Sequence, residues 1–395
     1  MEKAARVAKS VTGCSGILSA ARVASSLEGL TVDANNCEQY FRARYNADGA
    51  GASTVYIDGA ALATVLKGVK GPVDVDIQPD GLTAGGLTVA GVDPLSDELG
   101  LFDTPDLTEV QGVMSWTGKN FKAAVKRWGA VAKTDKQTTR MNLRGVYFEF
   151  TEQTTDIVTC DGYHLLRETY GGGVPQPAIG AGSMDRAIFK RDNPIDCGLF
   201  DILEIKRILP LIRPNDNVRF TVYSAGDNTP GEVAGKWLQI DVYSSWGDAR
   251  LLIKGTDEQY PDYRRVIPQN NDKAVFKIYA PDLAPVATAA KRAAPDDSGH
   301  CWLEITPDTP DRLTVNSGNG VSTYAGGVNI TAAIGRADKM DRTGINCHFL
   351  ELLSNFAGDT TAELSWAAPL QAIRADFTAP DGTACNYIMM PTNPN

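Results

Sequence analysis

The stretch that decides how this chain folds is Thr159-Cys160-Asp161-Gly162-Tyr163-His164-Leu165-Leu166. An Asp-Gly pair between two alternating apolar arms is a strong signal for a β-hairpin, because both residues tolerate the backbone of a tight turn. The arm before the pair begins at Asp156, and the arm after it runs to Arg167. The stretch therefore predicts an antiparallel hairpin whose tip is Asp161-Gly162.

The tip also collects reactive residue types, because Cys160, Asp161 and His164 lie within five positions. Nucleophilic catalysis requires groups that converge in space. Cys160 and Asp161 are neighbours in an alternating strand, so their side chains point to opposite faces. We therefore interpret the tip as non-catalytic and predict no catalytic residue, while a thiol hydrolase that uses Cys160 remains an alternative.

Length and composition are those of a soluble multidomain protein. The chain has 395 residues, of which 43% are hydrophobic and 22% are charged, and this length suggests two to four domains. No apolar run approaches the ~18 residues of a membrane span, and the stretch Met1–Arg6 lacks the apolar core of a signal peptide. Seven scattered cysteines without a C-x-x-C motif indicate reduced thiols, so we expect a cytoplasmic protein with no membrane partner.

A weak internal repeat occurs three times along the chain, and such repeats decide the architecture. Each copy opens with a short helical stretch, then a strand, a turn and a second strand, and it continues with another helical stretch and a strand of alternating polarity. The second strands, which are the most alike, are Leu30–Asp33, Ile157–Cys160 and Leu313–Asn316; the later helical stretches are 57–69, 200–212 and 348–356; the alternating strands are 73–77, 218–222 and 362–366.

The repeat predicts an α+β fold made of three similar domains, each with two helices packed on antiparallel sheets. Composition turns to loop near Asp103–Gly112 and again near Pro268–Asp272. We therefore expect domains at 1–112, 113–272 and 273–395. The middle copy carries two additional loops, at 170–196 and 225–234, which we expect at the surface.

Basic residues gather on the helices although the whole chain has a formal net charge of −10. In the stretch Gly118–Lys133, an apolar stripe and a set of lysines each recur at helical spacing. Lysines on one face of a single helix usually mean only that this face is exposed to solvent. Here, however, basic residues recur on helices of all three copies. A basic stripe on an acidic protein is typical of contact with a phosphate backbone. The basic residues are Lys3, Arg6, Lys9, Lys67, Lys70, Lys119, Lys122, Lys126, Arg127, Lys133, Lys206, Arg207, Lys291 and Arg292.

Motifs for metal or nucleotide binding are absent from the sequence. The dipeptides His300-Cys301 and Cys347-His348 lack the spacing of zinc ligands, and we interpret both cysteines as core residues. No G-x-x-x-x-G-K-[ST] loop occurs. We therefore expect no metal, no cofactor and no enzymatic activity.

Four stretches together resemble the bacterial replicative sliding clamp family, the beta subunit of DNA polymerase III. They are Leu143–Glu149, Cys160–Leu165, Tyr260–Pro268 and Tyr387–Pro391. The resemblance implies a homodimer in which two subunits join head to tail, each forming half of a ring with helices inside and sheets outside. It also implies four kinds of partner: duplex DNA without sequence preference, a replicative DNA polymerase, an ATP-driven clamp loader, and other replication or repair proteins that carry short linear motifs. Such a protein would be a non-catalytic processivity factor in DNA replication, associated with the nucleoid in the cytoplasm.

The resemblance also assigns residues to surfaces. Its partner-peptide pocket, between the second and third domains, would be lined by Leu143, Cys160, Gly162, Tyr163, His164, Leu165, Pro261, Arg265, Val266, Leu370, Ile388, Met389, Met390 and Pro391. The basic residues named above, together with Gln137, would face DNA. Ala293 and Ala294 would lie at the dimer seam, where the family often has larger apolar residues.

Two departures from the family pattern affect the pocket. Tyr163 and His164 stand where the family usually has His and Arg, and the C-terminal residues Thr392–Asn395 carry no basic side chain. A different peptide preference is therefore expected. The alternative to a clamp is a repeat-built protein- or carbohydrate-binding module without a DNA role, which would need neither the helix-borne lysines nor the Pro261–Pro268 stretch.

Overall fold

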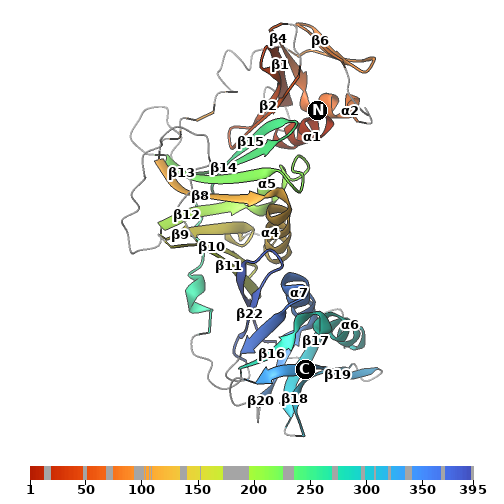
Figure 1. Cartoon of the computed structure of the whole chain (residues 1–395), viewed down its shortest axis with the longest axis vertical. Coiled ribbons are helices and arrows are strands. Elements are labelled where there is room, and N and C mark those ends of the chain that lie inside the picture. The colour runs from red at the N-terminus through yellow and green to blue at the C-terminus, as the bar shows by residue number, and fades with distance from the viewer. Residues whose placement is uncertain are drawn as a thin grey trace. The chain divides into compact units, whose positions relative to one another are not determined.

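The structure is a computed structural model of the whole chain (Figure 1). It describes residues 1–395 except 13–18, 48–50, 68–73, 93–101, 103, 106, 108, 134–139, 152, 172–194, 226–234, 269–274, 295–298, 307, 319–321, 334–339, 366–369 and 393–395. None of the described helices is long and apolar enough to cross a membrane.

The chain divides into two compact units. Unit 1 contains Met1–Val125, Glu149–Gln153 and Gly172–Asp257, and unit 2 contains Lys126–Phe148, Thr154–Gly171 and Glu258–Asn395. This division does not test the three predicted domains at 1–112, 113–272 and 273–395, which remain a prediction.

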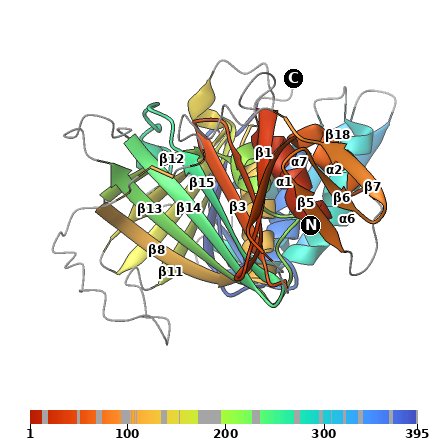
Figure 2. The ribbon, with the colours of Figure 1, turned by 90° about the horizontal axis from the view of Figure 1, so that it is seen from above.

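An eight-stranded antiparallel sheet forms the centre of unit 1. Figure 2 shows β3, β15, β14, β13 and β8 side by side in this sheet. The strand order is β4-β1-β2-β3-β15-β14-β13-β8. The strands are β1 (Ala20–Ser26), β2 (Gly29–Asn35), β3 (Gln39–Tyr45), β4 (Ser53–Asp58), β8 (Glu109–Thr117), β13 (Asn217–Ala225), β14 (Gly235–Ser244) and β15 (Gly247–Lys254). A small sheet holds β5 (Val75–Gln78), β6 (Gly81–Ala84) and β7 (Leu87–Ala90). The strand β12 (Ile195–Asp201) belongs to neither of these two sheets.

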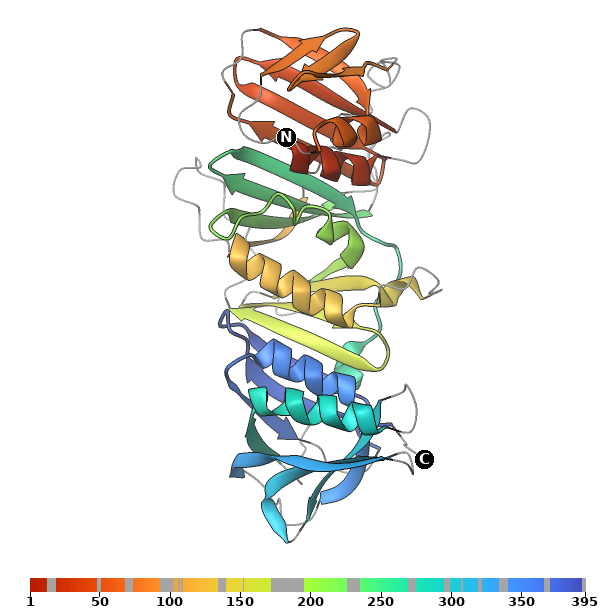
Figure 3. The same ribbon diagram turned by 90° about the vertical axis from the view of Figure 1, so that its right-hand side faces the viewer.

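The first helix of unit 1 buries its apolar residues and leaves its basic residues exposed. In α1 (Glu2–Val11), the buried residues are Ala4, Ala5, Val7, Ala8 and Val11. This helix packs beside α2 (Gly59–Val65) (Figure 3), which begins where the Asp58 carboxylate accepts hydrogen bonds from two backbone amides. The short helix α5 (Ile202–Lys206) begins at Asp201, whose carboxylate accepts a hydrogen bond from the Leu203 amide. The helix α4 (Gly118–Val131) passes from unit 1 into unit 2 after Val125.

Unit 2 is built on a second large sheet and a pair of helices. Its strands follow the order β9-β10-β11-β23-β22-β21-β16-β19-β18-β17-β20. The helices α6 (Leu283–Ala293) and α7 (Cys347–Ala357) lie side by side (Figure 3). Short 3-10 turns occupy η2 (Met141–Leu143), η3 (Tyr263–Arg265) and η4 (Ala280–Asp282). The strands are β9 (Gly145–Phe150), β10 (Thr154–Cys160), β11 (His164–Gly171), β16 (Val275–Tyr279), β17 (His300–Thr306), β18 (Thr309–Gly318), β19 (Thr323–Ala333), β20 (Met340–Asn346), β21 (Thr361–Ser365), β22 (Ile373–Thr378) and β23 (Ala384–Met389).

The predicted α+β class and the predicted hairpin are confirmed. β10 and β11 pair antiparallel, with Cys160 opposite Leu165, and the tip Asp161-Gly162 joins them. All three predicted second strands lie in observed strands, namely β2, β10 and β18.

One predicted helical stretch is shorter than expected. Only Ile202–Lys206 of the stretch 200–212 is α-helical, and turns follow it. In these turns the amides of Arg207, Leu209 and Leu211 each donate to the carbonyl three residues earlier. Pro210 lacks the amide hydrogen that a continuing helix requires. The predicted surface loops at 170–196 and 225–234 lie mostly outside the described residues.

Candidate partner-binding pocket and basic helix surface

The hairpin tip is held by its own aspartate. The Asp161 Oδ1 accepts hydrogen bonds from the backbone amides of Tyr163 (2.8 Å) and His164 (2.9 Å). Gly162 adopts φ +94°, in the left-handed region that favours glycine. Burial alone would raise the pKa of Asp161, but the hydrogen bonds and charge of His164 outweigh it and lower that pKa. The tip therefore presents Tyr163, whose side chain is 64% exposed.

Below the tip lies a small apolar cluster, which we call the pocket floor. Leu165 of β11 and Ile388 of β23 are register partners, and both are buried in it. The floor consists of Val158, Leu165, Tyr263, Ile267 and Ile388, with Tyr147, Cys160, Tyr260, Val266 and Ala372 packed against it. Strands from the hairpin and the C-terminus thus meet the stretch Tyr260–Pro268, as the resemblance implies.

Two residues assigned to the pocket face the other way. His164 and Met389 are register partners one position from Leu165 and Ile388, so strand alternation turns them to the opposite side of the sheet. The His164 ring stacks on Phe349 of α7 at 4.6 Å between ring centroids, and its Nδ1 lies 2.7 Å from the Tyr387 hydroxyl. Both side chains are buried on that side, so they do not contribute to the pocket floor.

The remaining pocket residues divide into an exposed rim and a half-buried wall. The backbone amide of Met390 donates to the carbonyl of Tyr163 (2.9 Å), which ties the C-terminal strand to the hairpin tip. Leu143 is buried close to the tip, because a Cβ at Gly162 would lie 3.7 Å from its Cδ1. The exposed members are Gly162, Tyr163, Pro261, Arg265 and Leu370, and the half-buried members are Cys160, Val266, Met390 and Pro391.

Sequence reasoning missed an aromatic stack beside the floor. The rings of Tyr147 and Tyr260 lie parallel with centroids 4.8 Å apart. The Tyr260 hydroxyl is buried and has no hydrogen-bond partner among the described residues, and burial raises the pKa of this phenol well above its usual value. Tyr147 alternates with the buried Val146 and Phe148 in β9, and that alternation was the signal available in the sequence.

Cys160 is poorly suited to nucleophilic chemistry. Burial raises the pKa of its thiol to about 11. Because the thiolate is the reactive form, such a pKa leaves very little nucleophile at neutral pH. These surroundings favour a structural role for Cys160 over a catalytic one.

The predicted basic surface is partly exposed. Lys3, Arg6 and Lys9 are all exposed on α1. On α4, Phe121 packs against Phe220 with ring centroids 5.2 Å apart, which turns Lys119 and Lys126 to solvent. Lys67, Lys291 and Arg292 are also exposed, Lys133, Lys206 and Arg207 are half-buried, and Lys70 and Gln137 lie outside the described residues.

Lys122 departs from this set because its ammonium is engaged with the protein. Its Nζ donates to the carbonyl of Ile212 at 2.5 Å. Burial and, next, the positive charge of Lys3 lower the pKa of Lys122. The positive charges of Lys3 on α1 and Lys122 on α4 therefore act on each other within unit 1.

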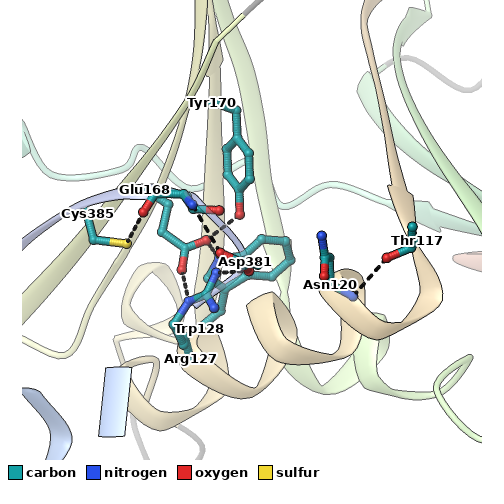
Figure 4. Close-up of polar contacts among 9 residues, drawn as sticks. Thr117, Asn120, Arg127, Trp128, Glu168, Tyr170, Asp381 and Cys385 are labelled. Carbon is teal, nitrogen blue, oxygen red and sulfur yellow. Dashed lines mark hydrogen bonds and ion pairs between the residues drawn. The ribbon is translucent and has the colours of Figure 1, made fainter. Parts of the chain in front are cut away.

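Arg127 is among the residues predicted to face DNA, but its charge is directed into unit 2. Its guanidinium is buried and pairs with Glu168 of β11 and, through Nη2, with Asp381 at 2.8 Å (Figure 4). Glu168 also accepts hydrogen bonds from Trp128 Nε1 (2.8 Å) and from the Tyr170 hydroxyl (2.6 Å). Burial would lower the pKa of Arg127, but the two carboxylates outweigh it and raise that pKa.

The two alanines predicted at the dimer seam have little exposed surface. Ala293 and Ala294 are 6% and 7% exposed in the single chain. Their place at the seam stays a prediction.

Other candidate sites in unit 2 do not coincide with the pocket. Cys301 and Cys347 are buried, and hydrogen bonding between their thiols raises the pKa of Cys301. Within the described parts of the chain, no three His, Cys, Asp or Glu residues gather as metal ligands would. A hollow of about 350 Å³ lies elsewhere on the sheet, and its lining includes no residue of the predicted pocket.

Comparison with solved structures identifies the architecture. The DNA polymerase sliding clamp of Pseudomonas aeruginosa aligns over 99% of this chain and 97% of its own, with a TM-score of 0.73 at 15% identity. The chain has the sliding-clamp fold. The DNA polymerase III beta subunit of Thermotoga maritima aligns over 99% of this chain and 96% of its own (TM-score 0.72, 15% identity). The beta chain from Streptococcus pneumoniae aligns over 99% and 97% (TM-score 0.70, 14% identity). No family model and no curated protein matches the sequence.

The sliding-clamp fold confirms the resemblance drawn from four short stretches, and it extends that resemblance over almost the whole chain. At such low identity the likeness concerns the fold, so the roles of individual residues in this chain remain proposals.

Proposed function

We infer that this protein is a DNA sliding clamp, a non-catalytic processivity factor that encircles duplex DNA as a head-to-tail dimer. The observation that carries this inference is the full-length match to the clamp fold combined with exposed basic residues on helices of an acidic chain. A clamp holds DNA by topology and needs only non-specific attraction to phosphates, which basic side chains provide. This function places the protein on DNA in the cytoplasm.

We also propose that the pocket at the hairpin tip binds the partner proteins of the clamp. Its apolar floor, its exposed Tyr163 and Leu370, and its half-buried Met390 suit a short peptide with Leu or Phe anchors. A methionine adapts its shape to several ligands. The pocket would therefore tether a replicative polymerase, an ATP-driven clamp loader and other replication or repair proteins in turn.

The DNA-facing surface is tested by charge reversal on three exposed lysines, one from each predicted domain. Lys9, Lys126 and Lys291 are changed together to Glu, and binding to a labelled duplex is measured by fluorescence anisotropy over a salt series. The parent protein should bind two unrelated sequences equally, with the logarithm of the binding constant falling linearly with the logarithm of salt concentration. The triple variant should bind at least roughly tenfold more weakly with a shallower slope.

A matched control has the same change in net charge at lysines on strands. Lys236, Lys254 and Lys277 lie on β14, β15 and β16, and their reversal should leave most of the binding. Equal losses in the two variants would mean that only net charge matters, which would contradict a DNA surface on the helices.

A further inference from the structure

The sheet of unit 1 contains an apolar row beside a charged row. The apolar row runs across six strands through register partners Val23, Val32, Ala43, Ala249, Val242 and Val218, all of them buried. One position along, the register partners are Arg22, Asp33, Arg42, Arg250, Asp241 and Arg219. Since successive side chains alternate between faces, the charged row lies on the opposite face of the sheet from the buried one.

Within the charged row, two arginines stand directly opposite each other. Arg42 of β3 and Arg250 of β15 are register partners, and like charges in this position destabilise a sheet. Each is drawn to the aspartate on its outer side: Arg42 Nε donates to Asp33 at 2.6 Å, and Arg250 Nε donates to Asp241 at 2.7 Å. Their side chains nevertheless remain 48% and 47% exposed.

Both arginines line a groove of about 620 Å³ on this face. The groove also has aromatic walls, formed by Tyr40, Tyr56, Phe102 and Tyr243. The guanidinium of Arg22 lies 5.1 Å from the Phe102 ring centroid, which orders that wall by a cation–π contact. The groove therefore offers two half-exposed guanidinium groups, each with an aspartate on one side, flanked by aromatic side chains.

We propose that this groove is a second docking site, which binds a peptide segment of a partner protein through a carboxylate on Arg42 and Arg250. An acidic side chain between the two guanidinium groups would relieve their repulsion and form charge-assisted hydrogen bonds. Neighbouring aromatic or apolar residues of the peptide would pack on the ring walls. The site lies wholly in unit 1, shares no residue with the hairpin-tip pocket and stands independently of the proposed clamp function.

Charge complementarity favours a peptide over a nucleic acid. The lining contains four arginines (Arg22, Arg42, Arg44 and Arg250) and four acids (Glu28, Asp33, Asp241 and Asp248). Such a lining has no net charge, and Asp33 and Asp241 flank the arginine pair on both sides. A phosphate chain would meet these carboxylates at its next phosphates, whereas a peptide needs to place only one acid between the arginines.

The test is an array of octapeptides in which acidic and aromatic residues are varied at every position, probed with the labelled full-length chain. Peptides that bind are then measured in solution against Arg42→Gln/Arg250→Gln. We expect peptides with an acid beside an aromatic residue to bind, and to lose roughly tenfold or more in affinity with the double variant. Replacing the acid by its amide should cause a similar loss.

The matched control is Arg219→Gln, which removes another arginine of the same row that is not among the described lining residues of the groove. It should change peptide affinity less than twofold, and thermal unfolding should show that both variants fold. The proposal is overturned if no peptide distinguishes parent from double variant, or if a single-stranded thymidine oligonucleotide or inorganic phosphate competes as well as the acidic peptides do.

Discussion

Arg127 and Lys126 are neighbours in α4, yet their surroundings are opposite. Lys126 is exposed, and Arg127 is buried against Glu168 and Asp381. Removing one partner of a buried ion pair leaves an uncompensated charge in the interior. We expect Arg127→Ala to lower the free energy of unfolding by roughly 3–5 kcal/mol, measured by urea denaturation.

Lys126→Ala is the adjacent control for this prediction. As an exposed helix residue it should change the free energy of unfolding by less than about 0.5 kcal/mol, and it should weaken duplex binding. The assignment of the two residues would be contradicted if Arg127→Ala left stability unchanged and reduced DNA affinity instead.

The sequence alone does not predict that Lys126 is exposed and Arg127 is buried. Helical spacing correctly turns Lys119 and Lys126 outward, because the stripe containing Phe121 and Trp128 fixes the buried face. Arg127 lies next to that stripe, and its partners Glu168 and Asp381 are 41 and 254 positions away. A pattern that considers only local spacing counts it as one more basic residue.

At the scale of elements, the hairpin tip and the C-terminal strand supply the residues of the proposed pocket. Tyr163 and Leu370 are 64% and 70% exposed, so neither contributes much to the core. We expect Tyr163→Ser combined with Leu370→Ser to leave the melting temperature nearly unchanged. The same change should weaken binding of a labelled polymerase-derived peptide with Leu and Phe anchors at least roughly fivefold, since exposed apolar anchors dominate such contacts, as measured by anisotropy.

Leu27→Ser is the matched control, because Leu27 is 88% exposed in unit 1. It should leave peptide binding intact. Leu165→Ala is less informative, because Leu165 is only 1% exposed and its truncation should cost roughly 2–5 kcal/mol of stability. Unchanged peptide affinity in the Tyr163/Leu370 variant would place the partner site elsewhere.

The elements themselves were largely predictable, and their long-range pairing was not. Asp161-Gly162 and its alternating arms correctly indicate the hairpin. The pairing of β11 with β23 joins His164–Thr169 to Ala384–Met389, and no local signal specifies that register. Without it, Met389 was placed in the pocket together with Ile388, although alternation turns the two to opposite faces.

At the scale of the whole molecule, composition and charge distribution point in opposite directions. A net charge of −10 alone argues against DNA binding, whereas the helix-borne lysines argue for it. The fold match extends over 99% of the chain at 15% identity. What this sequence shares with its structural neighbours is therefore the fold rather than the identity of most residues.

The central claim is topological, and retention on circular DNA tests it most directly. The labelled protein is loaded on a nicked circular duplex with a clamp loader and ATP, and the DNA-bound fraction is isolated by gel filtration. A closed ring should stay with the circle at salt concentrations that abolish direct binding, and it should slide off when a restriction enzyme linearises the DNA. Equal retention on circular and linear DNA, or none on either, would contradict the account.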